Sequence, residues 1–417
     1  MYSTRRNFLK TGALAGIGIP LTGAANRKMS DSTQERYKKL DTALEQPVLK
    51  RRLFPNSVII QSCDLLHYEG NYMIRVRSTD GAEGFCVGHN YRMPHLYPIQ
   101  LQLVNPFFIG KDARNLDQLV DDVTMFKNNY KYQGYTLWIP VATVEIAILD
   151  MLGRIAKKSI GELIGDIHNT EIAVYQANNN RGKTAEESIE RIKARVEETG
   201  AKAVKFKIGG RRDIPESPPG RTEKLIPLMR KNFPDKTIYA DCNGSYGAKE
   251  AIRVGKILEA NKIDLFEQPV PTDYYEDWKA VADAVNIPIA SGGGEVSIRN
   301  FRWLIGNEAV QMVQQDIFYF GGMIRAMKVA RMAEAKDYPC TPHISGTGLG
   351  YIYMMHFVSA IPNAGPYHEY KGMSNEVPYV CESSTLKPEN GILHLPKGIG
   401  SGVEIDPDFI AKHKILT

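Results

Sequence analysis

Hydrophobic residues follow two different periods in the first part of the chain. Three runs, "SVIIQSCDLL", "YMIRVRSTDG" and "GFCVGHN", are separated by turns and predict an antiparallel meander. Apolar residues then recur every three to four positions in "NLDQLVDDVTMF" and in "VATVEIAILDMLGRIAKKSIGELIG", which predicts helices. We therefore expect an α+β domain over residues 48–165.

The rhythm changes after residue 166, where strand-like runs alternate with helix-length segments. "IAVYQANNN" is followed by a capping box of Thr184 and Glu187, an apolar stripe at Ile189 and Ile192, and a stop at Gly200. Further strand candidates are "AVKFKIGG", "KTIYADCNG", "IDLFEQPV", "IPIASGGGE", "VQMVQQDI", "YPCTPHIS" and "GPYHEY". Eight strands alternating with helices predict an α/β fold of the parallel βα-barrel type. A doubly wound open sheet is the alternative, but no glycine-rich phosphate motif opens the first βα unit.

The N-terminus carries a different signal. "TRRNFLK", with Arg5 and Arg6, precedes a Gly/Ala-rich stretch from Thr11 to Ala25 and is typical of a twin-arginine export signal. We assign residues 1–30 to this signal and its linker, and we expect the twin-arginine export machinery as a partner and the periplasm as the location. No later apolar run reaches the roughly 20 residues needed to span a bilayer, so stable membrane insertion of the mature chain is not expected.

Composition adds little beyond the class of protein. The chain has 43% apolar and 24% charged residues, as ordinary globular proteins do, and a formal net charge of +5. Arg5, Arg6 and Lys10 supply three of these charges. Nothing in this balance indicates a nucleic-acid partner.

Polar residues stand near the C-terminal ends of the predicted barrel strands, where βα barrels carry their active sites. In "AVKFKIGG", Lys205 and Lys207 are two residues apart and therefore point to the same face of a strand. The later positions follow at intervals of 21 to 34 residues, about one βα unit each: Asp241 with Asn243, Glu267, Glu295, Asp316, His343 and Glu369. We expect all of them to converge on one mouth of the barrel.

Three of these residues are carboxylates on consecutive strands. Asp241, Glu267 and Glu295 would repel one another strongly without a cation between them. Oxygen ligands of this kind suit Mg²⁺, with water or substrate in the remaining positions. The pattern therefore predicts one Mg²⁺ in the active site.

The next two strands offer an acid/base pair. Asp316 could hold one imidazole nitrogen of His343, which would orient the ring and raise its basicity. His343 would then act as a general acid or base.

This pattern resembles the enolase superfamily and, within it, the mandelate racemase subgroup. The shared features are K-x-K on the second strand, Asp, Glu and Glu on the third to fifth, and an Asp/His dyad on the sixth and seventh. "AILDMLGRIAKKSIGELIG" is similar to the junction between cap and barrel, and "LHLPKGIGSGVEID" to the closing C-terminal segment. The resemblance implies a (β/α)7β TIM-like barrel over residues 166–375, with an N-terminal α+β capping domain that the C-terminal segment, residues 376–417, completes.

The resemblance also implies roles. Mg²⁺ on Asp241, Glu267 and Glu295 would stabilise the enediolate formed when a proton α to a carboxylate is removed. Lys207 would be the base on one face, with Lys205 lowering its pKa by repulsion between like charges, and His343 with Asp316 would act on the opposite face. Glu369 would hydrogen-bond the substrate carboxylate or the enediolate.

Substrate contacts are expected from the cap and from one strand end. Asn243 lies two residues beyond a metal ligand on the same strand face, and "GHNYRMPH" places His89, Tyr91 and Arg92 in the loop that would cover the active site. The charged, proline-rich "GGRRDIPESPPGRTEK" is a second candidate lid. One departure concerns the third metal ligand, because three glycines precede Glu295 and leave its position in the coordination shell less defined.

The leading functional hypothesis is a Mg²⁺-dependent dehydratase of sugar acids, aldonates or aldarates. Lys207 would remove the C2 proton and His343 would protonate the departing C3 hydroxyl. The same groups would also serve a racemase, an epimerase or a cycloisomerase, and the residues do not separate these reactions. Two other classes are an exported sugar-acid binding protein on an inactive barrel and a barrel glycosidase using Asp241 and Glu267. The expected ligand is a small carboxylate, and a homo-oligomer is expected.

Overall fold

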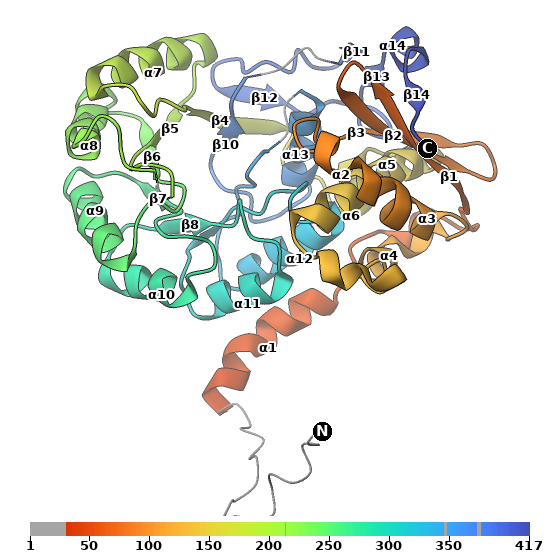
Figure 1. Ribbon diagram of the computed structural model, residues 1–417, viewed down its shortest axis with the longest axis horizontal. Coiled ribbons are helices and arrows are strands. Elements are labelled where there is room, and N and C mark those ends of the chain that lie inside the picture. Colours follow the sequence, from red (N-terminus) through yellow and green to blue (C-terminus); the bar gives the residue numbers. More distant parts are fainter. Residues whose placement is uncertain (1–30, 213, 346–347, 373–376) are drawn as a thin grey trace, which may run out of the picture.

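The structure is a computed structural model that describes residues 31–212, 214–345, 348–372 and 377–417. The predicted export signal, residues 1–30, lies outside the described residues. Figure 1 shows a ring of helices around short strands in one half of the molecule and a sheet with shorter helices beside it. The predicted α/β barrel with an α+β cap is confirmed.

The cap is built on an antiparallel sheet with strand order β14-β1-β2-β3. Its strands are β1 (Ile60–Tyr68), β2 (Asn71–Ser78), β3 (Glu83–Val87) and the C-terminal β14 (Lys414–Ile415). The first three are the predicted meander. The helices of the cap are α2 (Met93–Ile99), α3 (Asn105–Phe108), α4 (Leu116–Asp122), α5 (Tyr135–Ala156) and α6 (Ile160–Ile164).

The barrel strands form a parallel sheet in the order β10-β4-β5-β6-β7-β8-β9. Their bounds are β4 (Glu171–Ala177), β5 (Ala203–Lys207), β6 (Thr237–Asp241), β7 (Leu265–Glu267), β8 (Ile289–Ser291), β9 (Met312–Val313) and β10 (His368–Tyr370). The predicted strand in "YPCTPHIS" is reduced to single parallel bridges, from Cys340 to Val313 and from Cys340 to Ala364. These bridges continue the ring from β9 toward β10.

Helices alternate with the barrel strands, as Figure 1 shows. They are α7 (Ala185–Thr199), α8 (Arg221–Asn232), α9 (Ala248–Ala260), α10 (Tyr275–Ala284), α11 (Ile298–Gly306), α12 (Met323–Glu334) and α13 (Leu349–Ser359). Helix α7 has the predicted capping box, in which Thr184 and Glu187 bond each other's backbone N–H groups, and it ends at Gly200 with a left-handed φ of 64°. Local sequence alone accounts for both ends of this helix.

The strands present two different faces. Val204 and Phe206 of β5 pack outward into the main hydrophobic core, while Ala203 belongs to a small inner cluster inside the barrel. That inner cluster takes one side chain from each of six strands: Tyr175, Ala203, Tyr239, Leu265, Ala290 and Met312. Lys205 and Lys207 share the face of Ala203, so both lysines point into the barrel above this apolar floor.

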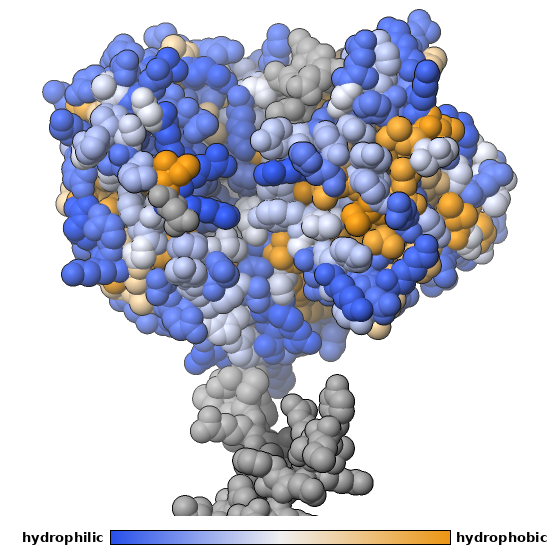
Figure 2. All heavy atoms as spheres, viewed as in Figure 1, coloured by the Kyte–Doolittle hydropathy of each residue, from blue (hydrophilic) through white to orange (hydrophobic). Residues whose placement is uncertain are grey.

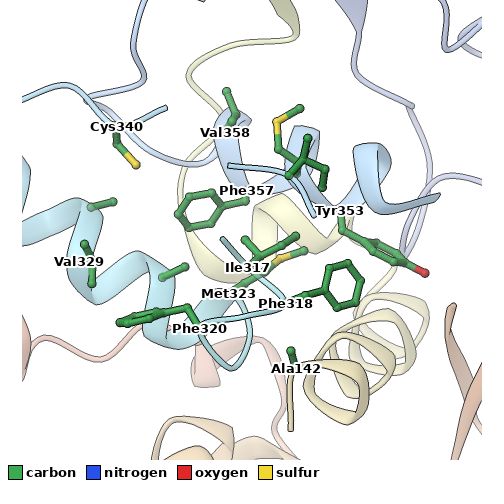
Figure 3. Packing of buried hydrophobic residues seen from close by; sticks show 14 of the residues in the cluster. Ala142, Ile317, Phe318, Phe320, Met323, Val329, Cys340, Tyr353, Phe357 and Val358 are labelled. Carbon is green, nitrogen blue, oxygen red and sulfur yellow. The ribbon is translucent and has the colours of Figure 1, made fainter. Parts of the chain in front are cut away.

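The long helix α5 joins the cap to the barrel. Figure 3 shows Ala142 of α5 beside Ile317 and Phe318, in a cluster that also takes side chains from α12 and α13. By length and composition α5 is apolar enough to cross a membrane, but 94% of its most apolar window is buried inside the fold. Burial on all sides explains why its sequence is apolar all round.

The chain after the barrel returns to both domains. Strand β12 (Ile392–His394) pairs with β4 of the barrel, β11 (Tyr379–Val380) pairs with β13 (Glu404–Ile405), α14 (Pro407–Ala411) follows, and β14 pairs with β1 of the cap. At the other end, α1 (Asp31–Glu45) lies along α11, where Asp41 pairs with Arg302 at 2.5 Å. The boundaries at residues 165/166 and 375/376 stay predictions.

Candidate active site

Adjacent strands place three charged side chains in one layer at the mouth of the barrel. The register pairs Lys207 with Asp241, and Asp241 with Glu267. Asp241 and Glu267 are 0% and 4% exposed. Carboxylates buried this deeply need compensating charge or hydrogen bonds, and the two lysines of β5 provide it.

Lys205 is the central cation of this group. Its Nζ lies 2.9 Å from Oε1 of Glu267 and 2.9 Å from Oε1 of Glu369. It also donates to the hydroxyl of Tyr175 at 3.2 Å. Burial opposes the charge, but the surrounding carboxylates outweigh it and raise the pKa of Lys205 well above its ordinary value. Lys205 is therefore a fixed ammonium group that holds two carboxylates.

Lys207 contacts the Asp241 carboxylate and keeps a partly open side chain, 15% exposed against 0% for Lys205. Its pKa lies below the ordinary value, as expected, but the largest cause is burial; repulsion by Lys205 adds to it, and Asp241 acts in the opposite direction. The expected repulsion by Lys205 is therefore present, although burial has the larger effect.

The predicted dyad is assembled. Nδ1 of His343 lies 2.8 Å from Oδ2 of Asp316. The other oxygen of Asp316 accepts hydrogen bonds from the backbone N–H groups of Phe318 and Tyr319, at 2.9 Å each. A carboxylate anchored in this way fixes the imidazole and leaves Nε2 of His343 available.

The structure does not gather Glu295 with Asp241 and Glu267 into one group of three ligands among the described residues. Oε1 of Glu295 accepts from the backbone N–H groups of Val296 and Ser297, at 2.7 and 2.8 Å. Its Oε2 accepts from the hydroxyl of Tyr275 at 2.7 Å. The three glycines carry the chain past the end of β8, and this carboxylate turns back onto the N-terminal turn of α11. The role of Glu295 as third metal ligand stays a prediction.

The remaining carboxylates still fit a divalent cation. Asp241 and Glu267 lie side by side on adjacent strands, and burial together with the charge of Asp241 raises the pKa of Glu267. Mg²⁺ is commonly held by one or two carboxylates, with water and substrate completing its shell. Among residues 31–212, 214–345, 348–372 and 377–417, no group of three or more His, Cys, Asp or Glu side chains could hold a metal. The structure thus brings two of the three predicted metal ligands, Asp241 and Glu267, together.

Glu369 is buried, with 1% exposure. Beyond its pairing with Lys205, its Oε2 accepts from the backbone N–H of Ile344 at 3.0 Å and lies 3.9 Å from Nε2 of His343. Burial opposes its ionisation, but the positive charge of Lys205 and its other cationic neighbours lowers the pKa of Glu369 well below its ordinary range. Glu369 therefore links the lysine layer to the dyad, and its contact with substrate stays a prediction.

The cap residues separate into three cases. Arg92 lines a cavity of about 210 Å³ together with Glu267 and His343. His89 is buried behind Tyr319, against which its ring stacks at 5.5 Å. Tyr91 is 78% exposed and lies under the Arg92 guanidinium. Neither His89 nor Tyr91 lines this cavity, so the structure supports only Arg92 among the three as a substrate contact.

Asn243 occupies the wall between two cavities, as expected of a substrate contact. It lines the 210 Å³ cavity and a second one of about 660 Å³ that contains Lys207 and His343. Its φ of 48° is left-handed, a conformation that asparagine tolerates better than most residues. Its Oδ1 accepts from Arg181, a residue that the sequence reasoning missed. The "NNNRG" run after the first barrel strand was the available signal.

Comparisons with known proteins identify the family. Residues 187–409, just over half of the chain, match the family described as enolase C-terminal domain-like. A crystal structure of a protein from Roseobacter denitrificans, described as a racemase, superposes with a TM-score of 0.79 at 30% identity, over 86% of this chain and 99% of that one. The chain belongs to the enolase superfamily, in its mandelate racemase branch, and is an enzyme of that superfamily.

Two enzymes and one further solved structure are similar to this chain at lower identity. Arabinonate dehydratase from Saccharolobus solfataricus is 26% identical over 81% of this chain and 89% of its own length. D-galactarolactone cycloisomerase from Agrobacterium fabrum is 24% identical over 82% of this chain and 91% of its own length. A mandelate racemase/muconate lactonizing protein from Paracoccus denitrificans, solved as a complex with magnesium, shares the fold with a TM-score of 0.75 at 23% identity, over 87% of this chain and 100% of that one. The last of these proteins shows that this fold can hold magnesium.

Proposed function

We propose that this protein is a lyase that dehydrates a sugar acid to a 2-keto-3-deoxy acid. The observation that carries the proposal is that Lys207 and His343 line the same cavity of about 660 Å³. Each is held by its own carboxylate, Lys207 by Asp241 and His343 by Asp316. Two positioned acid/base groups in one cavity suit a reaction that removes a proton from one carbon and protonates a leaving group on the next.

Lys207, in its neutral form, takes the proton from C2 of the substrate. The electron pair of that C–H bond forms the C2–C3 double bond as the C3–O bond breaks. Nε2 of His343 protonates the departing hydroxyl, which leaves as water. The resulting enol tautomerises to the 2-keto-3-deoxy acid, so atoms and electrons balance without an added oxidant or reductant.

Asp241 and Glu267 would hold the divalent cation, for which we propose Mg²⁺, one per active site. When bound, that cation supplies positive charge where negative charge develops on the substrate carboxylate. Lys205 holds Glu267 and Glu369 in place, because its ammonium group lies 2.9 Å from an oxygen of each. Asn243 and Arg92 face the substrate space from the barrel and from the cap.

A cycloisomerase or a racemase is the second candidate, because the same pair of groups could deprotonate one face and reprotonate the other. The cycloisomerase relative from Agrobacterium fabrum favours keeping this alternative. A non-catalytic binding protein is less well supported, since the base, the dyad and both remaining carboxylates are present.

The test is incubation of the purified protein and Mg²⁺ with a panel of aldonates and aldarates in deuterated water. We expect the wild type to form a 2-keto product, and we expect Lys207→Ala to lose both product formation and deuterium exchange at C2. The matched control is Lys202→Ala, which replaces an exposed lysine directly before β5. Deuterium exchange at C2 without keto product would favour the racemase or cycloisomerase. Binding without exchange or product would favour the binding protein.

We also propose export by the twin-arginine pathway to the periplasm, on the basis of Arg5 and Arg6 in "TRRNFLK". Replacing both arginines by lysine preserves charge but should abolish export, and fractionation of a tagged protein would measure it. Equal amounts of the wild type and of the double lysine variant in the periplasmic fraction would refute the proposal. Assembly into a homo-oligomer stays a prediction.

A further inference from the structure

The cavity that contains Lys207 and His343 has three further basic side chains in its wall. Arg181, Arg211 and Lys371 also line it, and no aspartate or glutamate is among its described lining residues. A cavity whose wall carries charge of one sign attracts ligands that carry the opposite charge. Figure 2 shows that hydrophilic residues predominate on the barrel side of the visible face, while apolar residues gather over the cap.

Arg181 makes no ion pair with a carboxylate among the ion pairs of the described residues. It lies in the loop after β4, half-buried, and its guanidinium donates to neutral acceptors: Oδ1 of Asn243 at 2.8 Å and the carbonyls of Ile208 and Asp241 at 3.1 and 3.5 Å. Its Nε is buried without any hydrogen-bond partner. A partly buried guanidinium without a paired anion is suited to bind one.

A second arginine holds the Arg181 loop in place. Arg221, at the start of α8, is 2% exposed. Its guanidinium donates to the carbonyls of Asn180 and Lys183, on either side of Arg181, at 3.2 and 2.8 Å. It also donates to the carbonyl of Lys207 at 2.8 Å. The position of Arg181 relative to the proposed base is therefore fixed before any ligand arrives, which lowers the cost of binding one.

Arg211 adds a cation from the next loop. It is exposed, follows β5, and lines both the 660 Å³ cavity and the 210 Å³ cavity. Lys371 is different, because it already pairs with Glu369 at 3.3 Å and donates to the carbonyl of Ile344. Arg181 and Arg211 are therefore the two cations of this cavity wall that can pair with an anionic ligand.

We propose that Arg181 and Arg211 form a subsite for a second anionic group of the substrate, a carboxylate at the end remote from the carbon that Lys207 deprotonates. This inference rests on the proposed function and narrows it: the substrate is an aldarate, with a carboxylate at each end, rather than an aldonate. A guanidinium fork binds a carboxylate with two parallel hydrogen bonds, so the subsite selects for charge and geometry together.

The test compares aldarates with aldonates of the same stereochemistry, such as galactarate with galactonate and glucarate with gluconate. We expect the wild type to prefer aldarates. Arg181→Met keeps side-chain length but removes the charge, and should lower kcat/KM for the aldarate about 100-fold, mainly through KM. For the aldonate the change should stay below about threefold. Arg299→Met is the matched control, because it replaces an exposed arginine on α11 outside the cavities described above.

Equal turnover of aldonates and aldarates by the wild type, or an equal loss on both in Arg181→Met, overturns the subsite while leaving the dehydratase intact. If no acid sugar is turned over, the proposed function fails, and calorimetric binding of galactarate decides the subsite separately. Binding lost in Arg181→Met but kept in Arg299→Met supports the subsite, whereas no binding to the wild type, or binding unchanged in Arg181→Met, overturns it. If Arg181→Met does not fold, Arg211→Met replaces it, because Arg211 is exposed.

Discussion

The hydroxyl of Tyr275 donates a hydrogen bond of 2.7 Å to Oε2 of Glu295. Together with the backbone N–H groups that Oε1 accepts, this bond commits the whole carboxylate to the start of α11. Tyr275 is itself the first residue of α10, so Glu295 ties two neighbouring helices together. A residue that has the chemistry of a metal ligand is here a structural connector.

Removing the charge of Glu295 should therefore leave cation binding intact. We expect Glu295→Gln to change the Kd for Mn²⁺ or Mg²⁺ by less than about threefold, whereas Glu267→Gln should weaken it by about 30-fold or more, because a bound divalent cation loses one of two carboxylates. Calorimetry or Mn²⁺ resonance on the purified proteins measures this without any substrate. Similar weakening of cation binding in both variants would show that Glu295 is a metal ligand.

Gly293 lies against the ring of His343. A Cβ built on this glycine would lie 3.0 Å from Cγ of His343, tighter than most Cβ contacts, so Gly293→Ala should push the ring by a few tenths of an ångström. We expect kcat to fall by about tenfold with the fold retained, since a shift of about 1 Å in a catalytic group costs about 100-fold. Gly247→Ala is the matched control, because a Cβ there meets nothing within 4 Å. Equal activity of the two variants would show that the ring does not depend on this contact.

Much of this site could be predicted because it follows from regular structure. The period of two in β5 places Lys205 and Lys207 on one face, and one βα unit per strand brings Asp241 and Glu267 beside them. Glu295 stands four residues beyond the end of β8, where no strand period constrains the direction of a side chain.

Arg181 was missed for a related reason. It follows three asparagines in a loop, and only tertiary hydrogen bonds from Arg221 to the flanking carbonyls fix its position. Likewise, nothing in the "GHNYRMPH" run indicates that Tyr319 would stand between His89 and the cavity. Periodicity predicts positions along elements, whereas contacts between loops depend on packing that a single sequence does not display.

We expect replacement of Lys205 to lower the stability of the folded protein. Lys205→Met leaves Glu267 and Glu369 buried without the ammonium group that lies 2.9 Å from each. We expect the free energy of unfolding to fall by about 3–5 kcal/mol in buffer without divalent cations, as when one partner of a buried ion pair is removed. Chemical denaturation measures it. Lys202→Met, on the exposed side of the chain, serves as the control, and a loss below about 1 kcal/mol in Lys205→Met would contradict this account of Lys205.

Outside the site, Glu145 should give stability a pH dependence. This glutamate of α5 is 0% exposed, and its Oε1 accepts from the backbone N–H of Ile324 at 2.7 Å, while its Oε2 has no partner among the described residues. Burial raises the pKa of Glu145 to about 8 from an ordinary 4.5, against the opposing effect of the backbone N–H groups at the start of α12.

The folded protein therefore keeps this carboxyl protonated where the unfolded chain has already lost the proton, so unfolding releases a proton between these two values. The stability that the neutral carboxyl contributes is complete below pH about 4.5 and is lost as the pH rises through about 8. Glu145→Gln removes this titration. Denaturation midpoints measured across this range should fall in the wild type relative to Glu145→Gln, while the exposed Glu186→Gln should follow the wild type. Parallel profiles for the wild type and Glu145→Gln would show that the carboxyl does not titrate within this window.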